Sequence, residues 1–380
     1  MTADSAPGDP EAADTASGDA TGDVTAATVG FVLAGAALVA AFLDWTPAVA
    51  MYGVPSLPGV ITAGLATGVL LLRRHGALDR TATPVAILGF VGVVASGAAA
   101  LLLPGIAGTD ATAGVGVYVA ILVGVVGVGI AYADYVGMGK DALLARIRDG
   151  LLATGIGIGG LLFAYLLVFA MVGLLGAFIP SGLQNSLVTA VFSVGLGLVA
   201  AGYALQRQEG LAYFDVRMPD KRGWIHVVLG LVGMFAVLLV GGVVSTMIGL
   251  PSAQHGIIQQ AQQNPAILLP LIPLSLLAIG PGEELLNRNV VQKSLYGAYS
   301  RWGAVLVATL IFTVIHVPAY GAGATPAALF VTLVRLFLVS LVLGVVYERT
   351  ENVVVAALVH GGFDAIQFGA AYLLITNGMA

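Results

Sequence analysis

The sequence has no cysteine, which excludes disulfide frameworks, thiol nucleophiles and cysteine-ligated metal sites. Charge is also scarce, because Asp, Glu, Lys and Arg together make up only 9% of the 380 residues. Hydrophobic residues make up 58%, glycine occurs 52 times, and the mean hydropathy is +0.98. This composition is typical of a membrane protein that crosses the bilayer several times.

The first 23 residues differ from the rest of the chain. They contain no Lys or Arg and six acidic residues, which are Asp4, Asp9, Glu11, Asp14, Asp19 and Asp23. A segment with so few large apolar side chains cannot bury a core, so we expect residues 1–23 to form a disordered acidic tail. The segment also lacks the basic and apolar regions of a cleaved signal peptide.

Apolar runs in the remaining sequence are long enough to cross a bilayer core about 30 Å thick as helices. They lie near residues 24–43, 57–72, 83–103, 113–133, 151–179, 185–205, 223–249, 265–282, 303–318, 326–346 and 353–376. We therefore predict an all-α polytopic transmembrane bundle with about eleven spans. Lys and Arg gather in every second loop, which predicts a cytoplasmic N-terminus and an external C-terminus in the cell membrane.

A polar stretch near residues 213–219 suggests a division of the chain. We expect an N-terminal bundle of unknown role at 24–222 and a C-terminal bundle at 223–380 that contains the functional core, at about 265–376. Glycine patterns elsewhere lie inside hydrophobic spans and follow no strand, so they give no nucleotide-binding signature. We expect no nucleic-acid partner.

Three charges interrupt one apolar run, at Glu283, Glu284 and Arg288. A charge at membrane depth costs several kcal/mol unless it is paired or faces a polar cavity, so this cluster indicates a functional site. Glu284 and Arg288 have the i, i+4 spacing of a helical ion pair. Glu283 points about 100° away from Glu284 and is left to face a cavity as a candidate general base. Pro281-Gly282 is expected to break or kink the helix.

Two further segments bring polar residues to the same depth. Counted from the basic residues at the predicted cytoplasmic interface, Glu283, His316 and His360 lie roughly 15–22 Å into the membrane. His360 and Asp364 share one helix face. We therefore expect these four side chains to converge near the middle of the bilayer.

Other polar residues are assigned less specific roles. His75, His226 and His255 lie at interfaces or in a loop, where we expect structural histidines. Arg335 lies in the middle of a span and needs a partner. A structural ion pair and a role near the site remain equally open for it.

Three motifs occur in order on successive hydrophobic segments and resemble those of the CPBP family. This family comprises CAAX proteases and bacteriocin-processing enzymes and includes the type II CAAX prenyl endopeptidases. The resemblance covers roughly residues 265–376 and is carried by Glu283-Glu284-x-x-x-Arg288, Phe312-x-x-x-His316 and His360-x-x-x-Asp364. It implies an intramembrane endopeptidase that hydrolyses membrane-associated protein or peptide substrates, with CAAX-type and prenylated proteins as candidates.

Carried over residue by residue, the resemblance assigns roles within the site. It implies that Glu283 and His316 hold and activate a water molecule, and that Glu284 pairs with Arg288. It also implies that His360 and the residue at position 364 stabilise the oxyanion.

The sequence departs from the family pattern at three positions. Asn287 and Asn289 flank Arg288 where the family often has Phe and Gly, which is expected to alter the packing of the substrate groove. Position 364 is Asp, whereas an Asn amide would donate directly to an oxyanion. Asp364 is therefore expected either to orient His360 or to keep it positively charged, instead of donating to the oxyanion.

Two other readings remain open. Zinc bound by His316, His360, Asp364 and Glu283 would make the protein a metalloprotease, although no cofactor is the preferred expectation because the chain lacks a close His-x-x-x-His pair. An ion-coupled transporter or a non-catalytic membrane scaffold are the alternatives outside enzymes. For the endopeptidase we expect a cavity that opens toward the cytoplasm and admits water.

Overall fold

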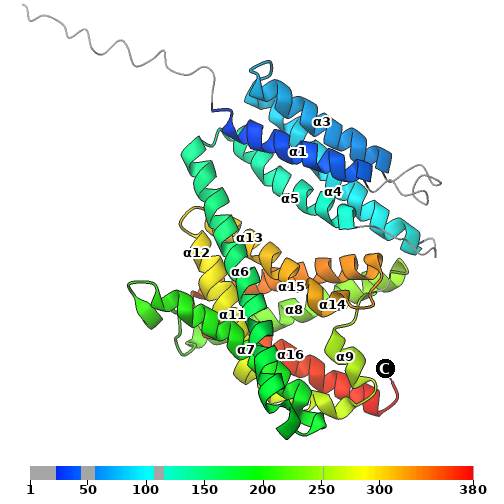
Figure 1. Ribbon diagram of the computed structural model, residues 1–380, viewed down its shortest axis with the longest axis vertical. Coiled ribbons are helices and arrows are strands. Elements are labelled where there is room, and N and C mark those ends of the chain that lie inside the picture. Colours follow the sequence, from blue (N-terminus) through cyan, green and yellow to red (C-terminus); the bar gives the residue numbers. More distant parts are fainter. Residues whose placement is uncertain (1–22, 44–55, 107–114, 251, 380) are drawn as a thin grey trace, which may run out of the picture. The chain divides into compact units, whose positions relative to one another are not determined.

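The computed structural model describes residues 23–43, 56–106, 115–250 and 252–379. Within these ranges every regular element is a helix and no strand occurs (Figure 1), which confirms the predicted all-α fold. The predicted acidic tail falls almost entirely on residues 1–22, which lie outside the described residues.

The described part contains nine helices that are long and apolar enough to cross a membrane. They are Leu57–Arg74, Arg80–Leu103, Gly116–Tyr135, Lys140–Phe178, Leu183–Leu205, Lys221–Met247, Pro265–Leu295, Pro326–Thr350 and Val353–Thr376. Two shorter apolar helices occur at Thr25–Ala41 and Arg301–Ile315. The chain is a multi-pass membrane protein, while the count of eleven spans and their orientation stay predictions.

The chain forms two compact units, residues 1–100 with 113–143 and residues 101–112 with 144–380. This division falls inside helix α6 (Lys140–Leu175), while the functional division expected near residue 222 stays a prediction. Most of α6 and all of α7 (Ser181–Leu205) therefore belong to the same unit as the motif helices. Apolar contacts explain this membership, because Leu196 of α7 packs with Leu286 and Val290 of the motif segment.

The first unit contains the helices α1 (Thr25–Leu43), α3 (Ser56–Arg74), α4 (Thr83–Ile106) and α5 (Val115–Tyr135), with a 3₁₀ turn at Arg80–Ala82. A buried ion pair joins two of them, with Arg73 Nε 3.1 Å from Asp134 Oδ2. The Thr83 hydroxyl donates to the same carboxylate at 2.6 Å. Gly127 is required where it is, because a Cβ atom there would lie 2.3 Å from the Phe90 ring.

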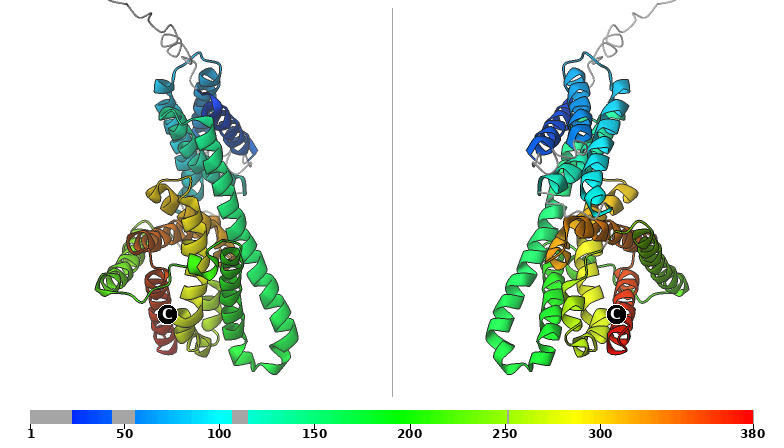
Figure 2. Two further views of the ribbon diagram at one scale, coloured as in Figure 1. Left: turned by 90° about the vertical axis from the view of Figure 1, so that its left-hand side faces the viewer. Right: turned by 90° about the vertical axis from the view of Figure 1, so that its right-hand side faces the viewer.

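The second unit contains the remaining helices. They are α6 (Lys140–Leu175), α7 (Ser181–Leu205), α8 (Lys221–Met247), α9 (Gly256–Ala261), α10 (Leu271–Leu274), α11 (Gly280–Glu284), α12 (Lys293–Leu295), α13 (Arg301–Ile315), α14 (Val317–Gly321), α15 (Pro326–Thr350) and α16 (Val353–Thr376). Short 3₁₀ turns occur at Gly176–Phe178, Gly210–Tyr213 and Pro265–Leu268. Helices α6 and α7 form a long hairpin that Figure 2 shows from two sides.

The motif segment continues through Pro281-Gly282 as a helix, without the break that was one of the two expectations, and it contains two π-helical stretches, Ser275–Ile279 and Leu285–Gln292. Such π-turns are frequent at functional sites. Close backbone contacts fix the segment between its neighbours. A Cβ atom at Gly282 would lie 2.2 Å from the Ser193 carbonyl oxygen of α7, and one at Gly361 of α16 would lie 2.3 Å from the Ser275 carbonyl oxygen.

Candidate functional site

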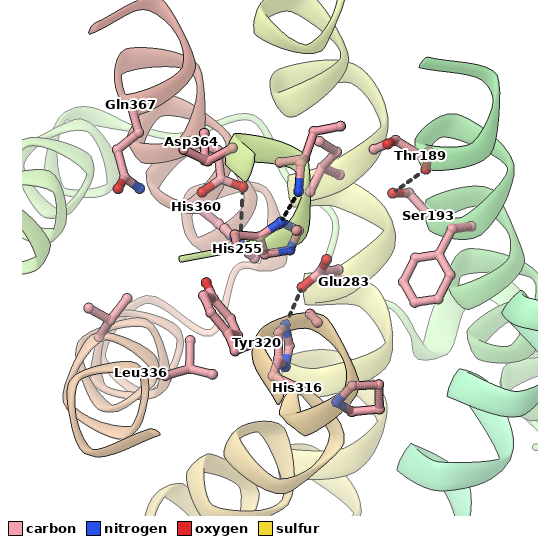
Figure 3. Close-up of a pocket in the computed structure, with 18 of the residues that line it drawn as sticks. Thr189, Ser193, His255, Glu283, His316, Tyr320, Leu336, His360, Asp364 and Gln367 are labelled. Atoms are coloured by element: carbon pink, nitrogen blue, oxygen red, sulfur yellow. Dashed lines mark hydrogen bonds and ion pairs between the residues drawn. The ribbon is translucent and has the colours of Figure 1, made fainter. Parts of the chain in front are cut away.

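A cavity of about 690 Å³ lies among the helices of the second unit, within the size range of ligand pockets. Figure 3 shows part of its lining. Four of the predicted site residues line it, namely Glu283 from α11, His316 at the end of α13, and His360 and Asp364 from α16. The structure therefore brings three separate segments of the chain to one cavity.

Glu283 and His316 face each other inside this cavity (Figure 3), with Glu283 Oε2 3.5 Å from His316 Nε2. The other ring nitrogen, His316 Nδ1, lies 2.7 Å from the Phe312 carbonyl oxygen. A carbonyl only accepts, so Nδ1 carries a proton and donates it. In the neutral ring, Nε2 is then a free acceptor beside a carboxylate. Glu283 Oε2 is buried and has no hydrogen-bond partner apart from the contact with His316 Nε2 at 3.5 Å.

Behind the cavity, Glu284 and Arg288 form the ion pair that their spacing predicted. Arg288 Nε lies 3.0 Å from Glu284 Oε2, and both side chains are fully buried. Arg288 Nη2 also donates to the Ser340 hydroxyl at 2.8 Å, and the guanidinium lies 5.2 Å from the centre of the Phe312 ring. The pair thus joins the motif segment to α15 and to the end of α13.

His360 has two acidic neighbours. Its Nδ1 atom lies 2.8 Å from Glu284 Oε1, and its Nε2 atom lies 3.5 Å from Asp364 Oδ2. Because a carboxylate buried beside Arg288 is an acceptor, Nδ1 donates to Glu284 and the ring orientation is fixed. The Nε2 edge is left for the cavity and for Asp364. The bond between Glu284 and His360 is a contact that the sequence did not predict.

The two asparagines that depart from the family pattern have different surroundings. Asn287 lines the cavity, and its amide donates to the Glu283 carbonyl at 2.9 Å. Asn289 lies outside the cavity, where its amide donates to Asp215 at 3.0 Å and to the Tyr347 hydroxyl at 2.8 Å. Asn289 therefore connects the polar segment near residue 215 to the motif helix. It was expected to affect the packing of the substrate groove, but it does not line the cavity.

Two further residues of the cavity were not among the predicted site residues, His255 and Tyr320. The His255 side chain accepts from the Ile257 N–H at 3.2 Å and so caps α9. Its ring packs edge-on to Tyr320 with 5.1 Å between the centroids. Burial and the neighbouring His316 lower the pKa of His255, with Glu283 acting in the opposite direction. His255, expected to be a structural loop residue, thus lines the same cavity as Glu283.

Tyr320 lies one helical turn after His316, so the two side chains share a face. Figure 3 shows the Tyr320 ring directed into the space between His316 and His360. Burial raises the pKa of its phenol, and Asp364 and Glu283 act in the same direction. The hydroxyl therefore keeps its proton and is available as a donor.

Helix α14, which lines part of the cavity, lies away from the basic end of the unit. Helix α14 follows α13, whose other end begins with Arg301, roughly 22 Å away at 1.5 Å per residue. Arg301 pairs there with Glu348 and Glu351. None of these three residues lines the cavity. The lining thus includes residues of the loops near 250–264 and 319–325, which contain no Lys or Arg, and an opening toward the cytoplasm stays a prediction.

Three of the cavity residues, His316, His360 and Asp364, are of types that bind zinc. In the described ranges, no group of three or more His, Asp or Glu side chains is arranged to hold a metal ion. His316 Nδ1 lies against a carbonyl oxygen and His360 Nδ1 against Glu284, an arrangement that leaves the Nε2 atom of each ring for the cavity and is also usual for metal-binding histidines.

Comparison with known proteins agrees with the motifs. Residues 265–366 match the family model described as type II CAAX prenyl endopeptidase Rce1-like. Searches of curated proteins and of solved structures gave no significant match. The match contains Glu283, Arg288, His316, His360 and Asp364 and confirms the resemblance to the CPBP and CAAX protease family for this part of the chain. It supports a membrane-embedded hydrolase that acts on peptide bonds.

Proposed function

We propose that this protein is an intramembrane endopeptidase that cleaves membrane-associated substrates of the CAAX type near their C-termini, with a water molecule activated by Glu283 and His316. The observation that carries this proposal is the pair of acceptor atoms, Glu283 Oε2 and His316 Nε2, 3.5 Å apart in a cavity with His360. A water molecule in this cavity can donate one hydrogen to each acceptor. Its oxygen lone pair is then directed away from them, toward a substrate carbonyl.

In the proposed reaction the water oxygen forms a bond to the scissile carbonyl carbon while Glu283 takes one of the water protons. The carbonyl oxygen becomes negatively charged and needs hydrogen-bond donors. When the carbon–nitrogen bond breaks, the proton held by Glu283 passes to the leaving amine. The other water proton remains on the new carboxyl group and passes to the amine or to solvent, so the products are a carboxylate and an amine with all protons accounted for.

Two side chains are suitably placed as donors to the oxyanion. His360 has its Nδ1 atom bound to Glu284 and presents its Nε2 edge to the cavity. The Tyr320 hydroxyl is directed into the same space (Figure 3). Asp364, whose Oδ2 atom lies 3.5 Å from His360 Nε2, is a positioning residue for the imidazole in this scheme and does not contact the oxyanion itself.

The buried contacts behind the cavity support different roles for the two glutamates. Glu284 is bound by both Arg288 and His360 and has no unpartnered oxygen, so it is a positioning residue. Glu283 has the unpartnered oxygen and faces the cavity. Only Glu283 is therefore free to accept a proton from water.

The test uses the purified full chain in lipid nanodiscs and a peptide that ends in a CAAX motif, with and without a farnesyl group on its cysteine. Mass spectrometry of the products identifies the cleaved bond, and H₂¹⁸O places the label in the new carboxylate. Glu283→Gln is expected to lower the rate by at least about 10³-fold, since the amide cannot take the proton. Glu209→Gln, at an exposed position, is the matched control. Cleavage by the Glu283→Gln variant at the wild-type rate would exclude the general-base role.

A further inference from the structure

Arg335 is an intramembrane cation that the mechanism above does not use. It lies nine residues after the start of α15, Pro326, in a helix that ends at Thr350. A guanidinium at this depth requires compensation, so its neighbours decide its role.

The neighbours of Arg335 are neutral. Its Nη2 atom donates to the Gly241 carbonyl oxygen at 2.6 Å and to the Ser245 hydroxyl, both on α8. Its Nε atom is buried and has no hydrogen-bond partner. No Asp or Glu of the described ranges forms an ion pair with it. The positive charge thus lacks an anion, and one of its donors is unused.

Arg335 also lines the cavity that contains Glu283, His316 and His360. The cavity-lining residues of α15 follow helical spacing and form one stripe, which consists of Thr332, Arg335, Leu336, Val339 and Leu343. Apolar side chains thus occupy the stripe on one side of Arg335, toward the Leu343 end. An anion with an apolar neighbour would be accommodated in such a cavity.

We infer that Arg335 binds the free C-terminal carboxylate of the substrate, so that the last, apolar residues of the peptide lie in the cavity between Arg335 and the Glu283–His316 pair. This inference rests on the proposed function. A guanidinium forms charge-assisted hydrogen bonds with a carboxylate, and these are stronger than bonds between neutral groups. Substrate binding then provides the missing anion. The site selects peptides that end close to the scissile bond.

The first experiment compares two substrates with the wild-type protein. Two peptides with the same sequence are used, one with a free C-terminal carboxylate and one with a C-terminal carboxamide. We expect the wild-type protein to cleave the free acid with a kcat/KM at least about tenfold higher than the amide. Most of this difference is expected in KM, because Arg335 binds a part of the substrate away from the reacting atoms.

The protein variants complete a double-mutant cycle. Arg335→Gln is expected to lower kcat/KM for the free acid by about tenfold or more and to leave the amide unchanged, so that the preference disappears. Arg335→Lys keeps the charge and is expected to retain part of the preference. Arg349→Gln is the matched control, because Arg349 lies on the same helix, is exposed and does not line the cavity.

The outcomes separate this inference from the function on which it rests. If the wild type cleaves neither peptide, the proposed endopeptidase function fails and the carboxylate site fails with it. If the wild type cleaves both peptides equally, or if Arg335→Gln slows both equally, the carboxylate site is refuted while the function stands. Arg335 would then only connect α15 to α8. The wild-type comparison decides this even if the Arg335→Gln variant does not fold.

Discussion

The two adjacent glutamates should respond differently to the same substitution, and Glu284→Gln gives the larger effect on stability. Glu284 accepts from Arg288 Nε at 3.0 Å and from His360 Nδ1 at 2.8 Å, and its side chain is fully buried. Glutamine keeps the shape, but its amide group has only one oxygen. Its NH₂ group must then face either the guanidinium or the imidazole, which are both donors.

The magnitude follows from the buried charge that remains. Removing one partner of a buried ion pair costs about 3–5 kcal/mol, which is a large part of the total stability of a typical domain. We therefore expect Glu284→Gln to lower the midpoint of thermal unfolding and the yield of monodisperse protein. Glu283→Gln should change both quantities little, because Glu283 Oε2 has no hydrogen-bond donor closer than His316 at 3.5 Å.

The measurement is thermal unfolding of wild type, Glu283→Gln, Glu284→Gln and the exposed control Glu209→Gln in the same detergent, followed by size-exclusion chromatography. Arg288→Ala should resemble Glu284→Gln, since it leaves the partner carboxylate buried. Full stability of Glu284→Gln combined with complete loss of activity would contradict the positioning role of Glu284. The roles of the two glutamates would then have to be exchanged.

Two further predictions concern orientation and the oxyanion. Cysteines introduced at 73–80 or 206–222 should be labelled by a membrane-impermeant reagent only after the membrane is opened, and cysteines at 104–112 should be labelled from outside. The opposite pattern would invert the predicted topology, and the absence of native cysteine keeps the background low. Tyr320→Phe should lower kcat by on the order of 10²-fold with little change in KM, because the oxyanion loses one of its hydrogen-bond donors. An unchanged kcat for Tyr320→Phe would remove Tyr320 from the oxyanion site.

Local periodicity was sufficient to predict the parts of the site that lie on one helix. The Glu284–Arg288 pair and the shared face of His360 and Asp364 both follow from a spacing of four residues. The same spacing, applied to His316, would also have found Tyr320. Distances counted along helices place the three motif segments at similar depth, because each helix has a fixed rise per residue, and these segments line one cavity.

Contacts between segments could not be obtained in this way. The bond from Glu284 to His360 depends on how the motif segment packs on α16, where Gly361 allows the two backbones to approach closely. His255 reaches the cavity because the start of α9 lies against α14, where its ring meets Tyr320, and nothing in the local sequence indicates this packing. The π-helical stretches likewise shift the helical phase after Pro281 without a clear sequence signal.

The central claim is that Glu283 and His316 activate water without a metal ion, and a metal titration of the active wild-type protein tests it most directly. Cleavage of the CAAX peptide is measured before and after treatment with a chelator, and the zinc content is measured in the same samples. We expect full activity after chelation and less than stoichiometric zinc throughout. About one zinc per chain, lost together with the activity and restored with it, would contradict the account and make His316, His360 and Asp364 ligands of a metal.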